Sequence, residues 1–177
     1  MTMKRILLYI TGAAMLLTAG AISAFAQGSN VVSNGDFNSG LSGWTTVAIS
    51  PSTVTATTVS PSQGPLVGTV ANINTVNFND SASLSQAVSL TTGSTYRLAF
   101  GYSTNRDFGM TLEVRISNGI DEDLVYNVPL TIGASDTIRD FVIPEGFDSA
   151  NITFIVTNLS GLSRRALIDN VSLTKLQ

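Results

Sequence analysis

Apolar and polar residues alternate along most of the chain after residue 44. Residues 96–103 show the clearest pattern, in which large apolar side chains occupy every second position: Tyr96, Leu98, Phe100 and Tyr102. Residues 110–117 repeat it, with Glu113 and Arg115 among the polar set. Successive side chains of a β-strand point to opposite faces of the sheet, so this alternation predicts strands with one buried face.

The rest of the chain consists of short runs rich in Val, Ile, Thr and Phe, separated by turn residues. Asn34-Gly35 and Asn118-Gly119 predict turns, because Asn and Gly both tolerate positive φ. Residues 50–65 predict a loop with one edge strand at 53–59, and a low-complexity linker is the alternative. Further strands are predicted at 44–49, 67–73, 84–90, 124–130, 137–143, 150–157 and 165–176. This pattern predicts an all-β, two-sheet antiparallel β-sandwich of about nine or ten strands.

The first 26 residues resemble a secretion signal peptide. Lys4 and Arg5 precede a mostly apolar stretch, and Ala24-Phe25-Ala26 provides the small residues that signal peptidase requires. We therefore expect cleavage after Ala26 and a single domain over residues 27–177. A membrane anchor is the alternative. The signal predicts a secreted protein at the cell surface, in the extracellular space or in the periplasm.

Charge and composition exclude several classes of function. Without Lys4 and Arg5, seven basic residues remain against 12 acidic ones, a net charge of −5. No basic cluster occurs, so neither nucleic acid nor an anionic membrane is an expected partner. The chain has no Cys and no His, which excludes disulfides, His-based nucleophilic triads and His-containing zinc sites.

Three motifs carry a resemblance to a known family. The first runs from Asn34-Gly35-Asp36-Phe37 to Gly40-Leu41-Ser42-Gly43-Trp44, and the second covers residues 95–100 after Gly93. The third, at residues 166–173, contains Asp169-Asn170-Val171. In this order the motifs resemble carbohydrate-binding modules of families 4, 9 and 22, over residues 30–176. The resemblance implies a galactose-binding-like jelly roll and a non-catalytic, polysaccharide-binding role, whereas Trp44 itself reads as a core residue.

The resemblance also implies a structural Ca²⁺ ion. Relatives of this type commonly hold Ca²⁺ where their terminal segments meet, and the matching positions here are Asn38 and Asp169. Asn38 stands where relatives often have Glu, so it offers a neutral carbonyl, and Asp36 is the residue that could compensate. The alternative is that Asp36 and Asp169 accept backbone hydrogen bonds at turns.

Residues 121–123 form a second acidic cluster, Asp121-Glu122-Asp123. Three adjacent residues on a turn point in different directions, and the spacing lacks the alternating pattern of a calcium loop. A solvated hairpin tip is therefore favoured over a metal site.

A sugar-binding face needs planar polar side chains and aromatic platforms. The outward positions of the predicted sheet supply the polar part of that face. Tyr126 and Phe108 are the expected exposed platforms, because the other aromatic residues share the apolar phase. The predicted carbohydrate-binding residues are Glu113, Arg115, Tyr126, Asn127 and Arg139.

Two functions remain open at this point. The first is a secreted carbohydrate-binding module that contacts polysaccharide or a cell-surface glycan. The second is a structural or interaction protein of the cell surface or extracellular matrix, which keeps the fold without binding glycan and can self-associate. An enzyme is not expected, because nothing in the sequence indicates the two facing carboxylates of a glycosidase.

Overall fold

The computed structural model describes residues 28–59, 64–120 and 123–177. The predicted signal peptide, the segment 60–63 and the pair Asp121-Glu122 lie outside the described residues. Ten strands are present, in the order β1 Thr45–Ala48, β2 Thr53–Val59, β3 Gly68–Thr75, β4 Ser81–Ser89, β5 Thr95–Thr104, β6 Met110–Ser117, β7 Leu124–Asn127, β8 Gly133–Val142, β9 Ser149–Asn158 and β10 Arg164–Lys175. Within these ranges, no helix has the length and apolar character that crossing a membrane requires.

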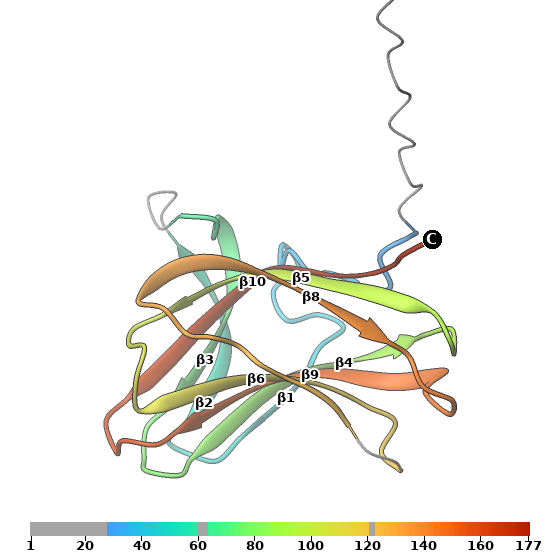
Figure 1. Cartoon of the computed structure of the whole chain (residues 1–177). Coiled ribbons are helices and arrows are strands. Elements are labelled where there is room, and N and C mark those ends of the chain that lie inside the picture. The colour runs from blue at the N-terminus through green and yellow to red at the C-terminus, as the bar shows by residue number, and fades with distance from the viewer. Residues whose placement is uncertain (1–27, 60–63, 121–122) are drawn as a thin grey trace, which may run out of the picture.

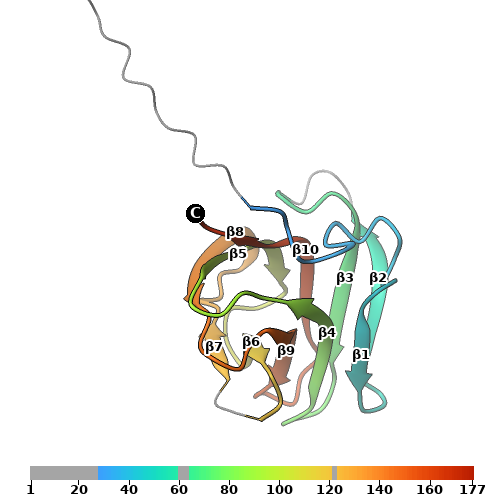
Figure 2. The ribbon, with the colours of Figure 1, turned by 90° about the vertical axis from the view of Figure 1, so that its right-hand side faces the viewer.

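The strands form two five-stranded antiparallel sheets packed face to face (Figure 1). The first sheet has the order β1-β4-β9-β6-β7, and the second has the order β2-β3-β10-β5-β8. The predicted all-β sandwich of nine or ten strands is therefore confirmed, as is the edge strand at residues 53–59. Figure 2 shows β1 and β2 together on one side of the molecule, and β7 and β8 together on the other.

The core between the sheets is built from the alternating apolar positions of both. On β5 the four predicted inward residues are all buried, and the same holds on β6. Phe154 of β9 lies near the centre, with its ring in an edge-to-face contact with Phe100 at 5.0 Å. Trp44 packs against Phe154 at 6.2 Å and against Phe37 at 5.4 Å. Only 8% of Trp44 is exposed, so its predicted place in the core is confirmed.

The turn before β1 is organised by the side chain of Asn34. Its Nδ2 donates to the carbonyl oxygens of Gly40 (3.0 Å) and Ser42 (2.9 Å), and its Oδ1 accepts from the Ser39 N–H. Asn34 has a φ of 46°, which Asn tolerates better than most residues. Its own carbonyl accepts a hydrogen bond from Trp44 Nε1 at 3.1 Å. The turn therefore holds the indole in place as the chain enters β1.

Gln86 fastens this N-terminal segment to β4. Its Oε1 accepts from the Ser33 N–H at 2.8 Å, and its Nε2 donates to the carbonyls of Ser33 (2.9 Å) and Gly43 (3.3 Å). Only 6% of Gln86 is exposed, so these bonds form away from water. Buried backbone groups that lose their partners carry a full desolvation cost.

A Gln86→Ala variant is expected to lose about 3 kcal/mol of unfolding free energy, because three backbone groups lose their partner. Urea unfolding of the chain from residue 27 onward measures this loss. Ser89→Ala is the matched control, since Ser89 is exposed on the same strand. Equal stability of the two variants would show that Gln86 does not anchor the segment.

Candidate functional site

The outer face of the first sheet carries mainly polar side chains. The strand register places Ser85, Thr153 and Arg115 in one row across β4, β9 and β6. A neighbouring row contains Ser83, Ile155, Glu113 and Asn127. On β4, β6 and β9 these residues alternate with buried core residues, and Asn127 on β7 is exposed, so their side chains lie on the outer face. We call this surface the open face.

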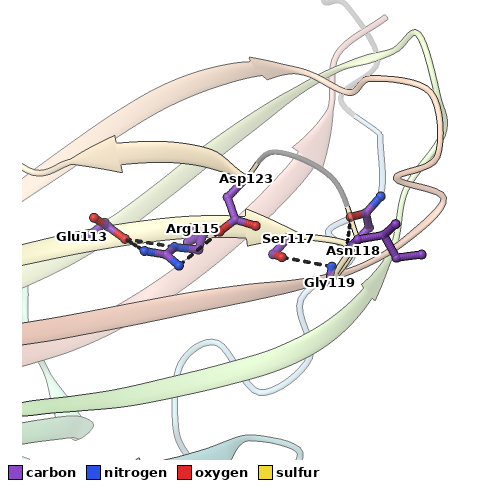
Figure 3. Close-up of polar contacts among 7 residues, drawn as sticks. Glu113, Arg115, Ser117, Asn118, Gly119 and Asp123 are labelled. Atoms are coloured by element: carbon purple, nitrogen blue, oxygen red, sulfur yellow. Dashed lines mark hydrogen bonds and ion pairs between the residues drawn. The ribbon is translucent and has the colours of Figure 1, made fainter.

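Charged side chains on the open face form one network around Arg115 (Figure 3). Arg115 Nη2 lies 2.7 Å and Nε 3.0 Å from Glu113 Oε1, while Nη1 lies 3.1 Å from Asp123 Oδ2. The hydrogen bond to Glu113 raises the pKa of Arg115 above its usual value, and the charges of both carboxylates add to this effect. The Arg115 side chain is 40% exposed, so a charged, planar group is held at the surface in a defined position.

The turn beyond β6 has the geometry that Asn118-Gly119 predicts. The Gly119 N–H donates to Ser117 Oγ and the Ile120 N–H donates to Asn118 Oδ1, each at 3.0 Å. Gly119 has a φ of 78°, which favours glycine. Of the acidic cluster at 121–123, only Asp123 is among the described residues, and it bonds Arg115 on the strand.

The structure brings together three of the five predicted sugar-binding residues. Glu113, Arg115 and Asn127 share the open face. Tyr126 does not, because it lies opposite the fully buried Val114 and therefore points to the inner side of the sheet.

Tyr126 and Arg139 instead meet between the edge strands of the two sheets. The Arg139 guanidinium lies 5.7 Å from the centre of the Tyr126 ring. The hydroxyls of Tyr126 and Thr137 lie 2.6 Å apart and share a hydrogen bond between β7 and β8. The expectation of one continuous face for all five residues is thus not met.

Sequence reasoning missed the hydroxyl and amide side chains of β4 and β9. Ser85, Asn151 and Thr153 occupy the polar phase of the strands predicted at 84–90 and 150–157, whereas Ser83 precedes the first of these ranges and belongs to β4 in the structure. The same alternation identifies them, once their strands are known to lie beside β6. Phe108, the other predicted platform, is 65% exposed, and it lies on the β5–β6 turn beside the Arg164 guanidinium at 5.8 Å.

The outer face of the second sheet is different, because a loop covers part of it. Leu66 is fully buried there with Val59, Val70 and Leu167. Gly101 makes room for it, since an added Cβ would lie 3.2 Å from the Leu66 side chain. This apolar cluster therefore covers part of the outer face of the second sheet.

The N- and C-terminal segments lie side by side, as Figure 1 shows. The Leu173 N–H donates to Asn30 Oδ1 at 2.8 Å, and the Val171 N–H donates to the Gly35 carbonyl at 2.8 Å. A pocket of about 390 Å³ lies at this junction, lined by Asn30, Val32, Asn34, Gly35, Asp36, Asn170, Val171 and Ser172.

The predicted calcium ligands lie close to this junction. Asp36 accepts hydrogen bonds from Asn38, at 2.7 Å from the side-chain amide and 3.3 Å from the backbone N–H. Asp169 is 1% exposed and accepts from the N–H groups of Asn170 (2.8 Å) and Val67 (3.1 Å). Hydrogen bonds from backbone N–H groups are what the alternative interpretation expects, in which Asp36 and Asp169 stabilise turns.

Burial raises the pKa of the Asp169 carboxyl, and the nearby charge of Asp36 raises it further. The carboxylates of Asp36 and Asp169 and the amide oxygen of Asn38 are oxygen donors of the type that Ca²⁺ prefers. The described residues contain no group of three acidic, Cys or His side chains that could hold a metal. Further oxygen ligands would therefore have to be backbone carbonyls or water.

Comparison with known proteins finds solved structures that share this fold. The sequence matches no protein-family model and no curated protein. A solved family 61 carbohydrate-binding module, TmCBM61 in complex with β-1,4-galactotriose, has a TM-score of 0.63 at 20% identity, over 83% of this chain and 99% of that one. A family 4 carbohydrate-binding module has a TM-score of 0.56 at 17% identity, over 81% and 99% of the two chains.

An enzyme also contains this fold. The enzymatically active domain of tailspike protein 4 from bacteriophage CBA120 has a TM-score of 0.65 at 21% identity, over 83% of this chain. The match spans only 21% of the tailspike chain. The structures with this fold are mainly carbohydrate-binding modules, so the jelly roll implied by the sequence resemblance is confirmed.

A Gly35→Ala variant tests how closely the two terminal segments approach. The added Cβ would lie 2.0 Å from the Val171 carbonyl oxygen, so the backbone must shift, at a cost of about 3 kcal/mol of unfolding free energy. Gly119→Ala is the control, because its Cβ meets no atom within 4 Å and only its positive φ is unfavourable. Urea unfolding in which Gly35→Ala costs no more than the control would contradict the close contact.

Proposed function

We propose that the protein is a secreted, non-catalytic carbohydrate-binding module that contacts polysaccharide through the open face. The arrangement that carries this proposal is the Arg115 network, set among hydroxyl and amide side chains on an uncovered sheet of a fold that carbohydrate-binding modules share. Secretion rests on the signal-like residues 1–26.

A fixed arginine is suited to binding sugar hydroxyls. Glu113 and Asp123 hold Arg115 before any ligand arrives, so little side-chain entropy is lost on binding. Ser85 and Thr153 extend the same row and offer hydroxyls that both donate and accept. Because the only large exposed apolar side chains on the described part of this face are aliphatic, such as Val47 and Val125, we expect many weak contacts with an extended chain.

Asn127 belongs to this surface, whereas Tyr126 and Arg139 would touch a glycan only where it passes over the edge between β7 and β8. The same network supports the non-catalytic part of the proposal. Glycosidases need two carboxylates on opposite sides of the scissile bond. Here Glu113 and Asp123 flank one arginine and pair with it.

A structural or interaction protein is the second candidate. The observation that favours it is the uncharged edge strand β2, which offers unpaired backbone groups for assembly. The two functions are compatible, because β2 belongs to the other sheet.

We also propose a structural Ca²⁺ ion between the terminal segments, with Asp36, Asn38 and Asp169 among its ligands. Burial and the charge of Asp36 both raise the pKa of the Asp169 carboxyl, and this supports the proposal. A cation there would offset the repulsion between the two carboxylates and stabilise the contact between the N-terminal turn and β10. Its role would be structural, and no step of glycan binding requires it.

An Arg115→Ala variant is expected to bind polysaccharide about tenfold to a hundredfold more weakly, since charge-assisted hydrogen bonds are lost. Affinity electrophoresis against a panel of soluble polysaccharides measures the change. Arg97→Ala is the matched control: Arg97 pairs with Asp140 on the outer side of the second sheet, and its side chain is 43% exposed. Equal retardation of both variants and the parent chain would contradict the assignment of the open face.

Excess Ca²⁺ is expected to raise the unfolding midpoint relative to a chelator, because the ion binds the native state. At a hundredfold excess over Kd the gain is about 2.7 kcal/mol. Asp36→Asn should reduce the shift, whereas Asp148→Asn, at a carboxylate that bonds Thr92, should retain it. The absence of any shift in the parent chain would refute the calcium proposal and leave the glycan proposal standing.

A further inference from the structure

Each of the two sheets has two edge strands. These are β1 and β7 in the first sheet and β2 and β8 in the second. An edge strand presents unpaired N–H and C=O groups that can pair with a strand of another chain. Proteins usually prevent this with short edge strands, charged side chains, proline or β-bulges.

Three of the four edges carry such protection. Strands β1 and β7 are only four residues long. Strand β8 is ten residues long, but it carries three charged side chains, those of Asp136, Arg139 and Asp140.

Among the described residues, strand β2 shows none of these four features. It has seven residues, Thr53–Val59, without a charge, a proline or a glycine, and six of the seven are β-branched. Thr53, Thr55 and Thr58 are exposed, and among the described residues β2 pairs with β3 alone. No charged residue occurs anywhere between Asp36 and Asp80.

We propose that β2 is a self-association edge, along which two copies of the chain pair antiparallel through β2 and join their second sheets into one. An antiparallel pair of identical strands obeys two-fold symmetry, so each copy contributes the same surface. The uncharged sequence supports a second copy as the partner. It brings no like charges together, and it offers no charge with which to select a different protein.

The neighbouring surface adds apolar area on the same side of the molecule. Val47 on β1 is 61% exposed, and Ile49 just after it is 71% exposed. Strands β1 and β2 lie beside each other in Figure 2. Pairing through β2 would satisfy its free backbone groups and bring these apolar side chains close to the contact.

The test introduces a charge at this edge. Size-exclusion chromatography with light scattering, over a wide range of concentration, should show the parent chain shifting from monomer to dimer. Thr55→Lys should remain monomeric, because each copy would bring a lysine into the contact, and the two like charges would lie close together. Thr53→Lys serves as a second variant if Thr55→Lys fails to fold. Ile138→Lys, at a 63% exposed position on β8, is the matched control and should dimerise like the parent chain.

A parent chain that is monomeric at every concentration would overturn the proposal, as would dimerisation of folded Thr55→Lys equal to that of the parent. Association that Ile138→Lys abolishes and Thr55→Lys preserves would assign the contact to β8 and also overturn it. Affinity electrophoresis of monomeric Thr55→Lys keeps this test separate from the proposed function. Its retardation by polysaccharide is expected to persist, because Arg115 lies on the other sheet.

Discussion

The attachment of the N-terminal turn to β4 is the contact on which the rest of the sandwich depends. Gln86 holds both polar groups of the Ser33 backbone, and Asn34 folds the turn that follows. That turn delivers Phe37 and Trp44 into the core beside Phe154. The preceding segment pairs with the end of β10 in the second sheet. The chain has no cysteine, so no disulfide can stabilise it. This polar anchor and the apolar core stabilise the fold instead.

The two outer faces of the sandwich are unequal. On the second sheet, Leu66 and its apolar neighbours cover the surface above Gly101. Asp169 secures this loop through the Val67 N–H, close to the junction of the terminal segments. The first sheet has no comparable apolar cluster among the described residues, and its polar side chains stay accessible around Arg115. A flat polar surface with a fixed guanidinium is suited to weak, repeated contacts with a polysaccharide chain.

Glycan binding by the open face and pairing through β2 would complement each other energetically. A face without aromatic platforms gives little affinity from a single contact. Pairing through β2 would present two open faces on one particle, and the second contact would then form at a high effective concentration. The charged edge of β8 and the short edges of β1 and β7 would confine the assembly to one contact, which closes by symmetry instead of growing into a fibre.

Local sequence patterns were enough to predict most of the strands, the two-sheet class and the burial of Trp44, because side-chain alternation and turn residues are local properties. It also identified Glu113, Arg115 and Asn127 as outward groups. The inward direction of Tyr126 became clear from strand pairing, since β7 is four residues long and Tyr126 lies opposite Val114 on β6. Strand pairing also places Ser85 and Thr153 in one row with Arg115, and the tertiary structure brings Asp169 to the Val67 N–H. Strands far apart in sequence become neighbours through long-range pairing, and an alternating pattern specifies which face a residue occupies but not which strand lies beside it.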